Sequence, residues 1–159
     1  MKIVETVGNN DILKQPKTAF LCSRHVPASV VIKCYDWAIA QRDAGRCIIS
    51  GFHSQLEKDV MHYLLKGNQP IILVPARGLK KRLEPELKDA LNGKRLLIVT
   101  PFDNEVKRVT TESSNLRNRL IVELADEIFV AYAQPGGNIE KLITDILNKG
   151  KIISSFKTG

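Results

Sequence analysis

The stretch that decides the fold is Leu96–Ala131, which reads LLIVTPFDNEVKRVTTESSNLRNRLIVELADEIFVA. It begins and ends with short, mainly apolar runs, Leu96–Val99 and Glu127–Ala131. Between them, apolar residues recur at helical spacing, at Leu116, Leu120, Ile121 and Leu124. Continuous apolar runs of this length are typical of strands buried on both faces, and a helix joining two such strands is the crossover of a parallel sheet. The stretch therefore predicts one β-α-β unit.

The same alternation continues outward to both ends of the chain. Further strands are predicted at Thr18–Cys22, Cys47–Ser50, Ile71–Val74 and Lys151–Ser154. Apolar residues at helical spacing predict helices within residues 27–45, 56–67, 79–91 and 139–150. We therefore predict a single α/β domain over residues 1–159, a three-layer Rossmann-like domain with a mainly parallel sheet of about six strands. Residues 1–17 fit the alternation poorly, and we expect them to add an edge strand or an arm.

Composition excludes several other classes of protein. The chain has 159 residues, of which 43% are hydrophobic and 26% charged, which is typical of one globular domain rather than a disordered chain or a coiled coil. No apolar run approaches the roughly 20 residues needed to span a bilayer, and the N-terminus does not look like a secretory signal. Cys22, Cys34 and Cys47 lack the spacing of a disulfide framework or a zinc site. We expect a reduced, cytoplasmic protein without a metal or a cofactor.

The charge of the chain favours two interpretations equally. The formal net charge is +7, and residues 77–119 contain 11 basic and 6 acidic residues, so this third of the chain supplies +5. An excess of this size is found on well-solvated surfaces, and it is also the electrostatic footprint of proteins that bind phosphates or a nucleic-acid backbone.

Ligands of open α/β sheets bind beyond the carboxyl ends of the strands. Five loops follow the predicted strands there, namely Ser23–His25, Ser50–Ser54, Pro75–Gly78, Thr100–Phe102 and Ala133–Asn138. Four of them contain Ser, Thr or Gly before a predicted helix, where unpaired backbone N–H groups would attract an anion. Gly136 and Gly137 allow a close backbone approach to a ligand, although they are equally typical of a plain turn. The chain contains neither GxGxxG nor GxxxxGK[ST].

Arg117 is the most informative single residue. It lies one helical turn before Ile121, on the face that carries the apolar stripe, so its guanidinium is expected in the cleft above the sheet. A guanidinium pairs bidentately with phosphate or carboxylate, whereas the alternative is an arginine whose stem only covers apolar surface.

Two kinds of ring side chain occur on the same loops. Phe52 and Phe102 could each serve as a stacking platform for a base, or as a buried loop anchor. His25 and His53 could contact a base or a phosphate, although ordinary loop histidines are favoured. No catalytic residue is predicted, because the G-x-S-x-G nucleophile signal is absent and Cys22 is expected to be a small core residue.

Three elements of the chain together resemble the DprA/Smf family. Its pattern of a strand ending in G-S-R appears as Cys22-Ser23-Arg24, and its S-G-x-A-x-G-I-D appears as Ser50–Glu57. Its R-N-R-x-I-x-x-L-S-D, the most specific of the three, appears as Arg117–Asp126. The resemblance extends from about residue 18 to residue 155. It departs at Gln55 and Glu57, which stand where the family has glycine and aspartate.

The resemblance implies a DNA-processing core. In that family the Rossmann-like core binds single-stranded DNA and helps to load the RecA recombinase during DNA uptake and recombination, and relatives often form homodimers through this kind of domain. It implies binding of single-stranded DNA or a nucleotide phosphate at the C-terminal edge of the sheet. The candidate binding residues are Ser23, Arg24, Ser50, Gly51, Phe52, His53, Arg117, Asn118, Arg119, Pro135, Gly136, Gly137 and Asn138.

The alternative is a nucleotide-sensing protein or a nucleotide phosphoribohydrolase of the LOG type, which belongs to the same SLOG superfamily. LOG enzymes carry an Arg-Lys pair before the fifth strand, whose arginine Arg117 matches. Pro135-Gly136-Gly137 matches the opening of their second motif, P-G-G-x-G-T-x-x-E. The match then ends, since Ile143 stands at the position of the catalytic glutamate and Glu140 lies three positions early. Hydrolysis of the N-glycosidic bond needs a positioned carboxylate, so a binding module is favoured over an enzyme.

Overall fold

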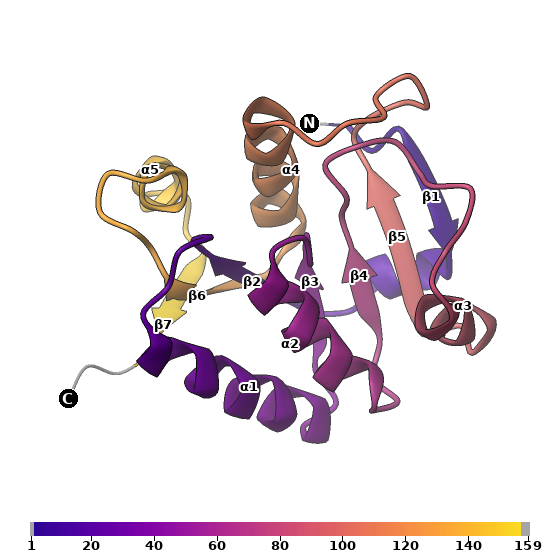
Figure 1. The fold of residues 1–159 in the computed structure, drawn as a ribbon, viewed down its shortest axis with the longest axis horizontal. Coiled ribbons are helices and arrows are strands. Elements are labelled where there is room, and N and C mark those ends of the chain that lie inside the picture. Colours follow the sequence, from indigo (N-terminus) through magenta and orange to yellow (C-terminus); the bar gives the residue numbers. More distant parts are fainter. Residues whose placement is uncertain (1, 157–159) are drawn as a thin grey trace.

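A seven-stranded sheet forms the centre of the molecule (Figure 1). The computed structural model describes residues 2–156. The strands, in chain order, are β1 Glu5–Gly8, β2 Lys17–Cys22, β3 Cys47–Ser50, β4 Ile71–Leu73, β5 Leu96–Thr100, β6 Glu127–Tyr132 and β7 Ile152–Ser155. Their order across the sheet is β1-β5-β4-β3-β2-β6-β7, and every neighbouring pair is parallel except β1 and β5.

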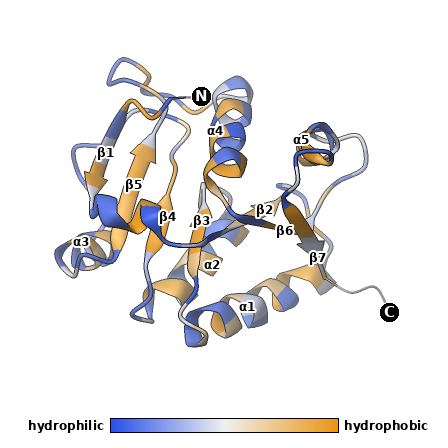
Figure 2. Ribbon diagram, turned by 180° about the vertical axis from the view of Figure 1, so that it is seen from behind, coloured by the Kyte–Doolittle hydropathy of each residue, from blue (hydrophilic) through white to orange (hydrophobic). Residues whose placement is uncertain are grey.

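The helices cover both faces of this sheet. They are the 3-10 helix η1 Asn10–Lys14 and the α-helices α1 Ala28–Asp43, α2 Gln55–Leu65, α3 Pro85–Asn92, α4 Thr111–Leu124 and α5 Asn138–Ile146. Buried residues of α1, α2 and α3 form one core with the strands, whereas η1, α4 and α5 form a second core on the opposite face. Figure 2 shows the result as mainly hydrophobic strands between helices with one hydrophobic and one hydrophilic side. The predicted three-layer architecture is confirmed.

Residues 1–17, which we expected to add an edge strand or an arm to about six strands, contribute an edge strand. The additional strand, β1, pairs antiparallel with β5 at the edge of the sheet. Most of its residues are exposed, because an edge strand covered on few sides needs no continuous apolar run. That is why residues 1–17 did not fit the alternation that revealed the central strands.

Two helix starts also differ from the apolar pattern. The predicted helix within residues 79–91 begins only at Pro85, where the missing N–H of proline costs no hydrogen bond. Helix α4 begins at Thr111, ahead of its first apolar residue, because Thr110 and Ser113 form a capping box at its N-terminus.

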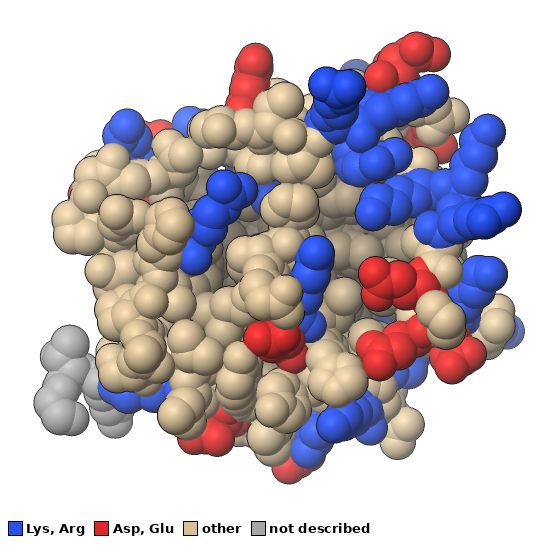
Figure 3. Space-filling model, in the orientation of Figure 1, with Lys and Arg blue, Asp and Glu red and all other residues tan. Residues whose placement is uncertain are grey.

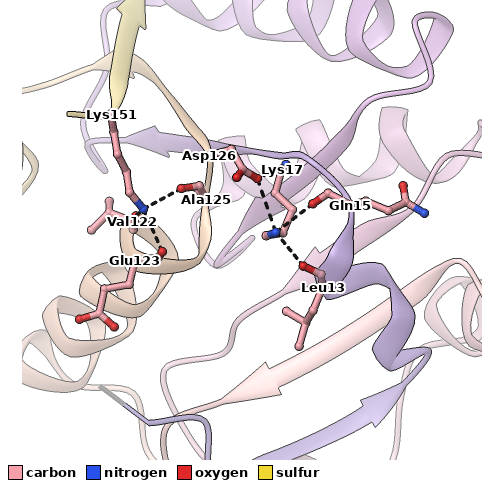
Figure 4. Close-up of polar contacts among 8 residues, drawn as sticks. All are labelled: Leu13, Gln15, Lys17, Val122, Glu123, Ala125, Asp126 and Lys151. Carbon is pink, nitrogen blue, oxygen red and sulfur yellow. Dashed lines mark hydrogen bonds and ion pairs between the residues drawn. The ribbon is translucent and has the colours of Figure 1, made fainter. Parts of the chain in front are cut away.

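Two lysines at the N-terminal edge of the sheet are enclosed by backbone oxygens (Figure 4). Lys17 Nζ donates to the carbonyl oxygens of Leu13 at 2.8 Å and Gln15 at 2.9 Å, and it lies 3.5 Å from the carboxylate of Asp126. The side chain of Lys17 is only 8% exposed. These contacts fasten the segment between η1 and β2 to the start of β6.

Lys151 makes the equivalent contact at the end of α4. Its Nζ donates to the carbonyl oxygens of Val122, Glu123 and Ala125 (Figure 4). The last carbonyl groups of a helix have no partner within the helix, and they carry the negative end of its dipole. Lys151 therefore satisfies the hydrogen bonds of this helix end and compensates its negative charge.

No helix in residues 2–156 has the length and apolarity needed to cross a membrane.

Candidate nucleic-acid interface

A hollow of about 530 Å3 opens at the C-terminal edge of β3, β4 and β5. We call it the C-edge hollow, and the residues that define it are Gly51–His53, Pro75–Lys80, Arg82–Glu84, Lys107 and Arg117. Further side chains reach it from α2, α3 and the edge strand β1. Figure 3 shows a depression with an uncharged floor and a dense group of basic side chains along one rim.

The rim of the C-edge hollow is strongly basic. It carries the side chains of Lys58, Arg77, Lys80, Arg82, Lys107 and Arg117. Three carboxylates, those of Asp59, Glu84 and Glu86, also line the hollow. Six cationic side chains against three carboxylates give the lining an excess of positive charge, which favours an anionic ligand.

Arg117 is a buried cation inside this hollow. Its residue surface is only 5% exposed, and burial lowers the pKa of its guanidinium, while Glu57 at longer range acts in the opposite direction. Nε donates to the side-chain oxygen of Asn118 at 2.8 Å, and Nη1 donates to the carbonyl oxygen of Val74 at 3.2 Å. Within residues 2–156, no carboxylate forms an ion pair with Arg117, and Nη2 has no hydrogen-bond partner.

This arrangement is unusual for a buried charge. Charged groups that are removed from water are normally paired with an opposite charge, because burial of an unpaired charge costs several kcal/mol. The guanidinium of Arg117 stays protonated even when its pKa is lowered. A bound anion at Nη2 would supply the missing partner.

Gly51 is the residue that lets the guanidinium lie at this point. A Cβ atom at position 51 would stand 2.2 Å from Nη1 of Arg117 and 2.5 Å from Cζ. Gly51, from the second element of the family pattern, therefore leaves room for the side chain of Arg117, from the third.

Phe52, the residue after Gly51, has a φ of 46° and is 3% exposed, so its ring belongs to the core although the residue lines the hollow.

His53 lines the hollow beside Arg117 but carries little charge of its own. Partial burial lowers the pKa of His53, and the charges of Arg117 and Arg24 lower it further. Arg24 has the smallest of these effects and does not line the hollow. Since its pKa is lowered from 6.5, His53 is mainly neutral at pH 7, and Arg117 rather than His53 provides positive charge beside it.

The backbone amides that we expected to be free at two helix starts are already occupied. Oε1 of Glu57 accepts from the N–H groups of His53 and Ser54, both at 3.0 Å. Oε1 of Glu140 accepts from the N–H of Gly136 at 3.0 Å. The expectation of unpaired amides is therefore wrong at these positions, because a side chain of the same helix acts as the internal anion.

The remaining candidates contact protein atoms outside the hollow. Ser50 is fully buried and donates to the carbonyl oxygen of Phe20 at 3.0 Å. Oγ of Ser23 accepts from the N–H of Gln134 at 2.8 Å, which joins the first loop to the last one. Arg119 faces away from the hollow, 3.3 Å from the carboxylate of Asp145 on α5.

The structure thus brings together four of the candidates in the hollow, Gly51, Phe52, His53 and Arg117, whereas Arg24 does not line it. The side-chain oxygen of Asn118 accepts from Nε of Arg117 and so orients its guanidinium. The turn at Pro135, Gly136, Gly137 and Asn138 lies beside the ends of β2 and β6 and does not line the hollow. The basic residues of the loops after β4 and β5 were not among the candidates. The excess charge of residues 77–119 was the signal that could have identified them.

The lining of the hollow, within the described residues, contains no Cys, Ser or Thr side chain, and the thiol of Cys22 lies outside it. A hydrogen bond with the thiol of Cys34, together with burial, raises the pKa of Cys22 above its ordinary value. Among residues 2–156, no group of three His, Cys, Asp or Glu side chains is arranged to hold a metal ion.

Fold and site together define a Rossmann-like α/β protein with a cationic hollow at the C-terminal edge of its sheet. The profile of the DNA recombination-mediator protein A family matches residues 3–144, and the chain belongs to this family. Comparison with curated proteins gave no match.

Three solved structures are similar to this chain. DNA processing protein A from Helicobacter pylori, solved to study its single-stranded DNA binding mode, has a TM-score of 0.77 at 18% identity over 97% of this chain and 71% of its own. DprA from Streptococcus pneumoniae has a TM-score of 0.78 at 20% identity over 97% of this chain, which spans only 54% of that protein. The molybdenum cofactor binding protein from Rippkaea orientalis has a TM-score of 0.59 at 10% identity, covering 90% and 78% of the two chains. At these identities the similarity shows a shared fold.

Proposed function

We propose that this chain is a DNA-processing core that binds single-stranded DNA through its phosphates at the C-edge hollow. The observation that supports this most strongly is the buried guanidinium of Arg117, which forms no ion pair within the described residues and is opposed only by the longer-range charge of Glu57. Family membership and the single-stranded DNA binding studied in the Helicobacter pylori protein favour DNA as the source of the anion.

The arrangement of charge supports a chain of phosphates rather than a single one. Lys58 lies on α2, Lys80 and Arg82 on the loop before α3, and Lys107 on the loop before α4, so cations surround the opening. Each neutralised phosphate of single-stranded DNA contributes about 0.7 to the slope of log affinity against log salt. A site of this kind should therefore bind with a marked salt dependence.

The role that follows is a step in DNA uptake or recombination in the cytoplasm, with a RecA-type recombinase as partner and a homodimer as the working form. These parts of the proposal rest on family membership. We do not propose the hydrolase alternative, because Glu140 is held by the N–H of Gly136 outside the hollow.

The proposal is tested by fluorescence anisotropy with a labelled oligothymidylate at several salt concentrations. Replacing Lys80 and Arg82 together by alanine should weaken binding and reduce the salt slope by about 1.4 if each contacts one phosphate. The matched control is the double replacement of Lys141 and Lys149 by alanine, which removes two exposed lysines outside the hollow and should leave the slope unchanged.

One further variant tests Arg117 itself. Arg117→Lys keeps the charge but loses the planar fork, and it should weaken binding about tenfold while the protein stays folded. Binding that is insensitive to salt, or that weakens equally in the control double variant, would contradict the proposal.

A further inference from the structure

Helix α2 begins beside the C-edge hollow with one of its own carboxylates bound to its first amides. His53 and Gln55, on either side of the N-cap residue Ser54, line the hollow. Oε1 of Glu57 accepts from the N–H groups of His53 and Ser54, both at 3.0 Å. Oγ of Ser54 accepts from the N–H of Glu57 at 3.2 Å. All three N–H groups therefore have acceptors within the start of the helix.

An open helix start is a common place for phosphate to bind in Rossmann-like proteins, because unpaired N–H groups and the positive end of the helix dipole face the ligand there. In this chain Glu57 takes that place at α2. Glu140 does so at α5, where its Oε1 accepts from the N–H of Gly136 at 3.0 Å. Anions in the hollow are therefore left with the side-chain cations of its rim.

The charge of Glu57 also acts on groups inside the hollow. The residue is half-buried, and its carboxylate raises the pKa of Arg117 and that of His53, against the larger effect of burial on each. Within residues 2–156 it forms no ion pair with Arg117. Its negative charge opposes any anion bound beside the guanidinium, and at a given distance this opposition is proportional to the charge of the anion.

Nucleic acids and free nucleotides present phosphate in two forms. An internal phosphodiester of a strand carries a single negative charge, whereas a terminal phosphomonoester carries about −1.5 to −2 at pH 7 and has three strong acceptor oxygens. The monoester needs more donors, and the charge of Glu57 opposes it roughly twice as strongly. The backbone donors that would suit it are the ones that Glu57 already holds.

We propose that Glu57 is a specificity-determining residue, which closes the N-terminus of α2 to terminal phosphate and so makes the C-edge hollow select the internal phosphodiesters of a strand over free nucleotides. This inference rests on the proposed function, because it concerns the choice of ligand at the same hollow. It predicts that removal of Glu57 strengthens binding of a phosphomonoester much more than binding of a phosphodiester.

The test uses two small competitors with the same base and sugar. Thymidine 5′-monophosphate carries a terminal phosphate, and its methyl ester carries a phosphodiester with one charge. Each is titrated against the complex of the protein with labelled oligothymidylate, in a phosphate-free buffer of low salt, and fluorescence anisotropy reports displacement. We expect the native protein to bind the two competitors with affinities within about threefold of each other, because Glu57 offsets the attraction of the rim for the second charge.

Variants at position 57 separate the charge of the carboxylate from its hydrogen bonds. Glu57→Gln keeps an acceptor oxygen, so loss of the charge alone should strengthen binding of the methyl ester about twofold and that of the monophosphate about fourfold, in proportion to their charges. Glu57→Ala also frees two N–H groups, and it should strengthen binding of the monophosphate about tenfold or more while the methyl ester stays near twofold.

Glu112→Ala is the matched control. Glu112 is an exposed acidic residue in the first turn of α4 that does not line the hollow, and the amides of Thr110 and Ser113 at that helix start are bound by side chains of the same two residues. Its removal should change both affinities by less than about twofold. Circular dichroism and thermal unfolding establish that each variant is folded, and Glu57→Gln, which retains the cap, carries the test if Glu57→Ala unfolds.

The outcomes separate this inference from the proposed function. Equal changes for the two competitors in folded Glu57→Ala and Glu57→Gln, or no displacement of the strand by monophosphate from either variant, would overturn the role of Glu57. A native protein that already binds the monophosphate about tenfold more tightly than the methyl ester would overturn it as well. All three results leave the proposed function intact, since the labelled strand is bound. Absence of strand binding by the native protein at low salt would overturn both.

Discussion

The two edges of the sheet contain cations in opposite situations. At the N-terminal edge, Lys17 and Lys151 donate to backbone carbonyl oxygens, two for the first and three for the second. At the C-terminal edge, Arg117 is as buried as Lys17 but has one carbonyl oxygen and one side-chain amide oxygen as its only hydrogen-bond acceptors among the described residues. Lys80 and Arg82 at the same edge form no ion pair within residues 2–156.

The difference separates structural cations from cations that are available to a ligand. A lysine ammonium has three N–H donors, and in Lys17 and Lys151 these are directed at carbonyl oxygens or, for Lys17, also at the carboxylate of Asp126. Removing such a lysine leaves those oxygens without this donor. A buried arginine with an unused nitrogen, next to an open hollow, keeps a donor for an external anion. Stability should therefore depend on the first group, and binding on the second.

The largest effect on stability is expected for Lys17→Met. The substitution leaves the carbonyl oxygens of Leu13 and Gln15 without this donor in a partly buried site and removes the charge beside Asp126, which should lower the free energy of unfolding by about 2–4 kcal/mol. Urea unfolding measures this change. Lys14→Met, on an exposed lysine three residues away, should change it by no more than about 0.5 kcal/mol. Similar losses in both variants would mean that the carbonyl contacts of Lys17 are not what stabilises this edge.

Gly51→Ala should affect both stability and binding. The new Cβ atom would stand 2.2 Å from Nη1 of Arg117 and displace the guanidinium from the carbonyl oxygen of Val74. We expect a loss of about 1–3 kcal/mol in unfolding free energy and about tenfold weaker binding of single-stranded DNA. The control is Gly93→Ala, whose Cβ would meet its nearest atom at 3.4 Å and should leave affinity unchanged. Native affinity in Gly51→Ala would separate Arg117 from DNA binding.

Arg119→Ala distinguishes the two arginines of one motif. Its exposed ion pair with Asp145 should contribute about 0.2–1 kcal/mol to stability, and its removal should not alter DNA affinity beyond the general effect of one surface charge. The comparison with Arg117→Lys in the same anisotropy assay sharpens the distinction. An equally large loss of affinity in Arg119→Ala would place the binding surface on the α5 side of α4 instead of in the hollow.

The smallest effect concerns the pH dependence of stability at the N-terminal edge. The N–H of Lys17, which donates to Asp126, is the main cause of the lowered pKa of that carboxyl group. A lowered pKa in the folded state adds stability that is fully present above the ordinary pKa of 3.8 and is lost as pH falls through the folded-state value. Asp126→Asn should therefore be less stable than the native protein at pH 7, and this difference should shrink as pH falls below about 4. A constant difference from pH 7 to pH 3, measured by urea unfolding, would show that the carboxylate charge is not involved.

Much of the fold could be predicted from the sequence because buried parallel strands leave a strong local signal. Cys47–Ser50 was predicted with the bounds that the structure shows, since all of its residues are buried. Glu5–Gly8 could not be recognised with the same certainty, because its partner β5 lies 88 or more residues away in sequence and most of its side chains are exposed. Whether such a segment forms a strand depends on pairing with a distant strand, which local sequence patterns do not show.

The candidate site was predictable where its residues lie on an element with a clear periodic pattern. The direction of Arg117 follows from helical geometry, so its location in the cleft could be inferred from the stripe on α4. The hydrogen bond from the N–H of Gly136 to Glu140 could not be predicted in this way. A glycine-containing loop before a helix does not reveal from its sequence whether its amides are free or already bound by a side chain. The basic loop of Lys80 and Arg82 has no periodicity, and only the folded chain shows that these residues border the hollow with Arg117.

The most direct measurement of the central distinction is chemical-shift mapping of the isotopically labelled chain with a short oligothymidylate at low salt. We expect the largest changes at the amides of Gly51, Phe52 and His53 and of the loop Arg77–Glu84, and almost none around Lys17 and Lys151. Changes concentrated at the N-terminal edge, or on the α5 side with none in the hollow, would contradict the account.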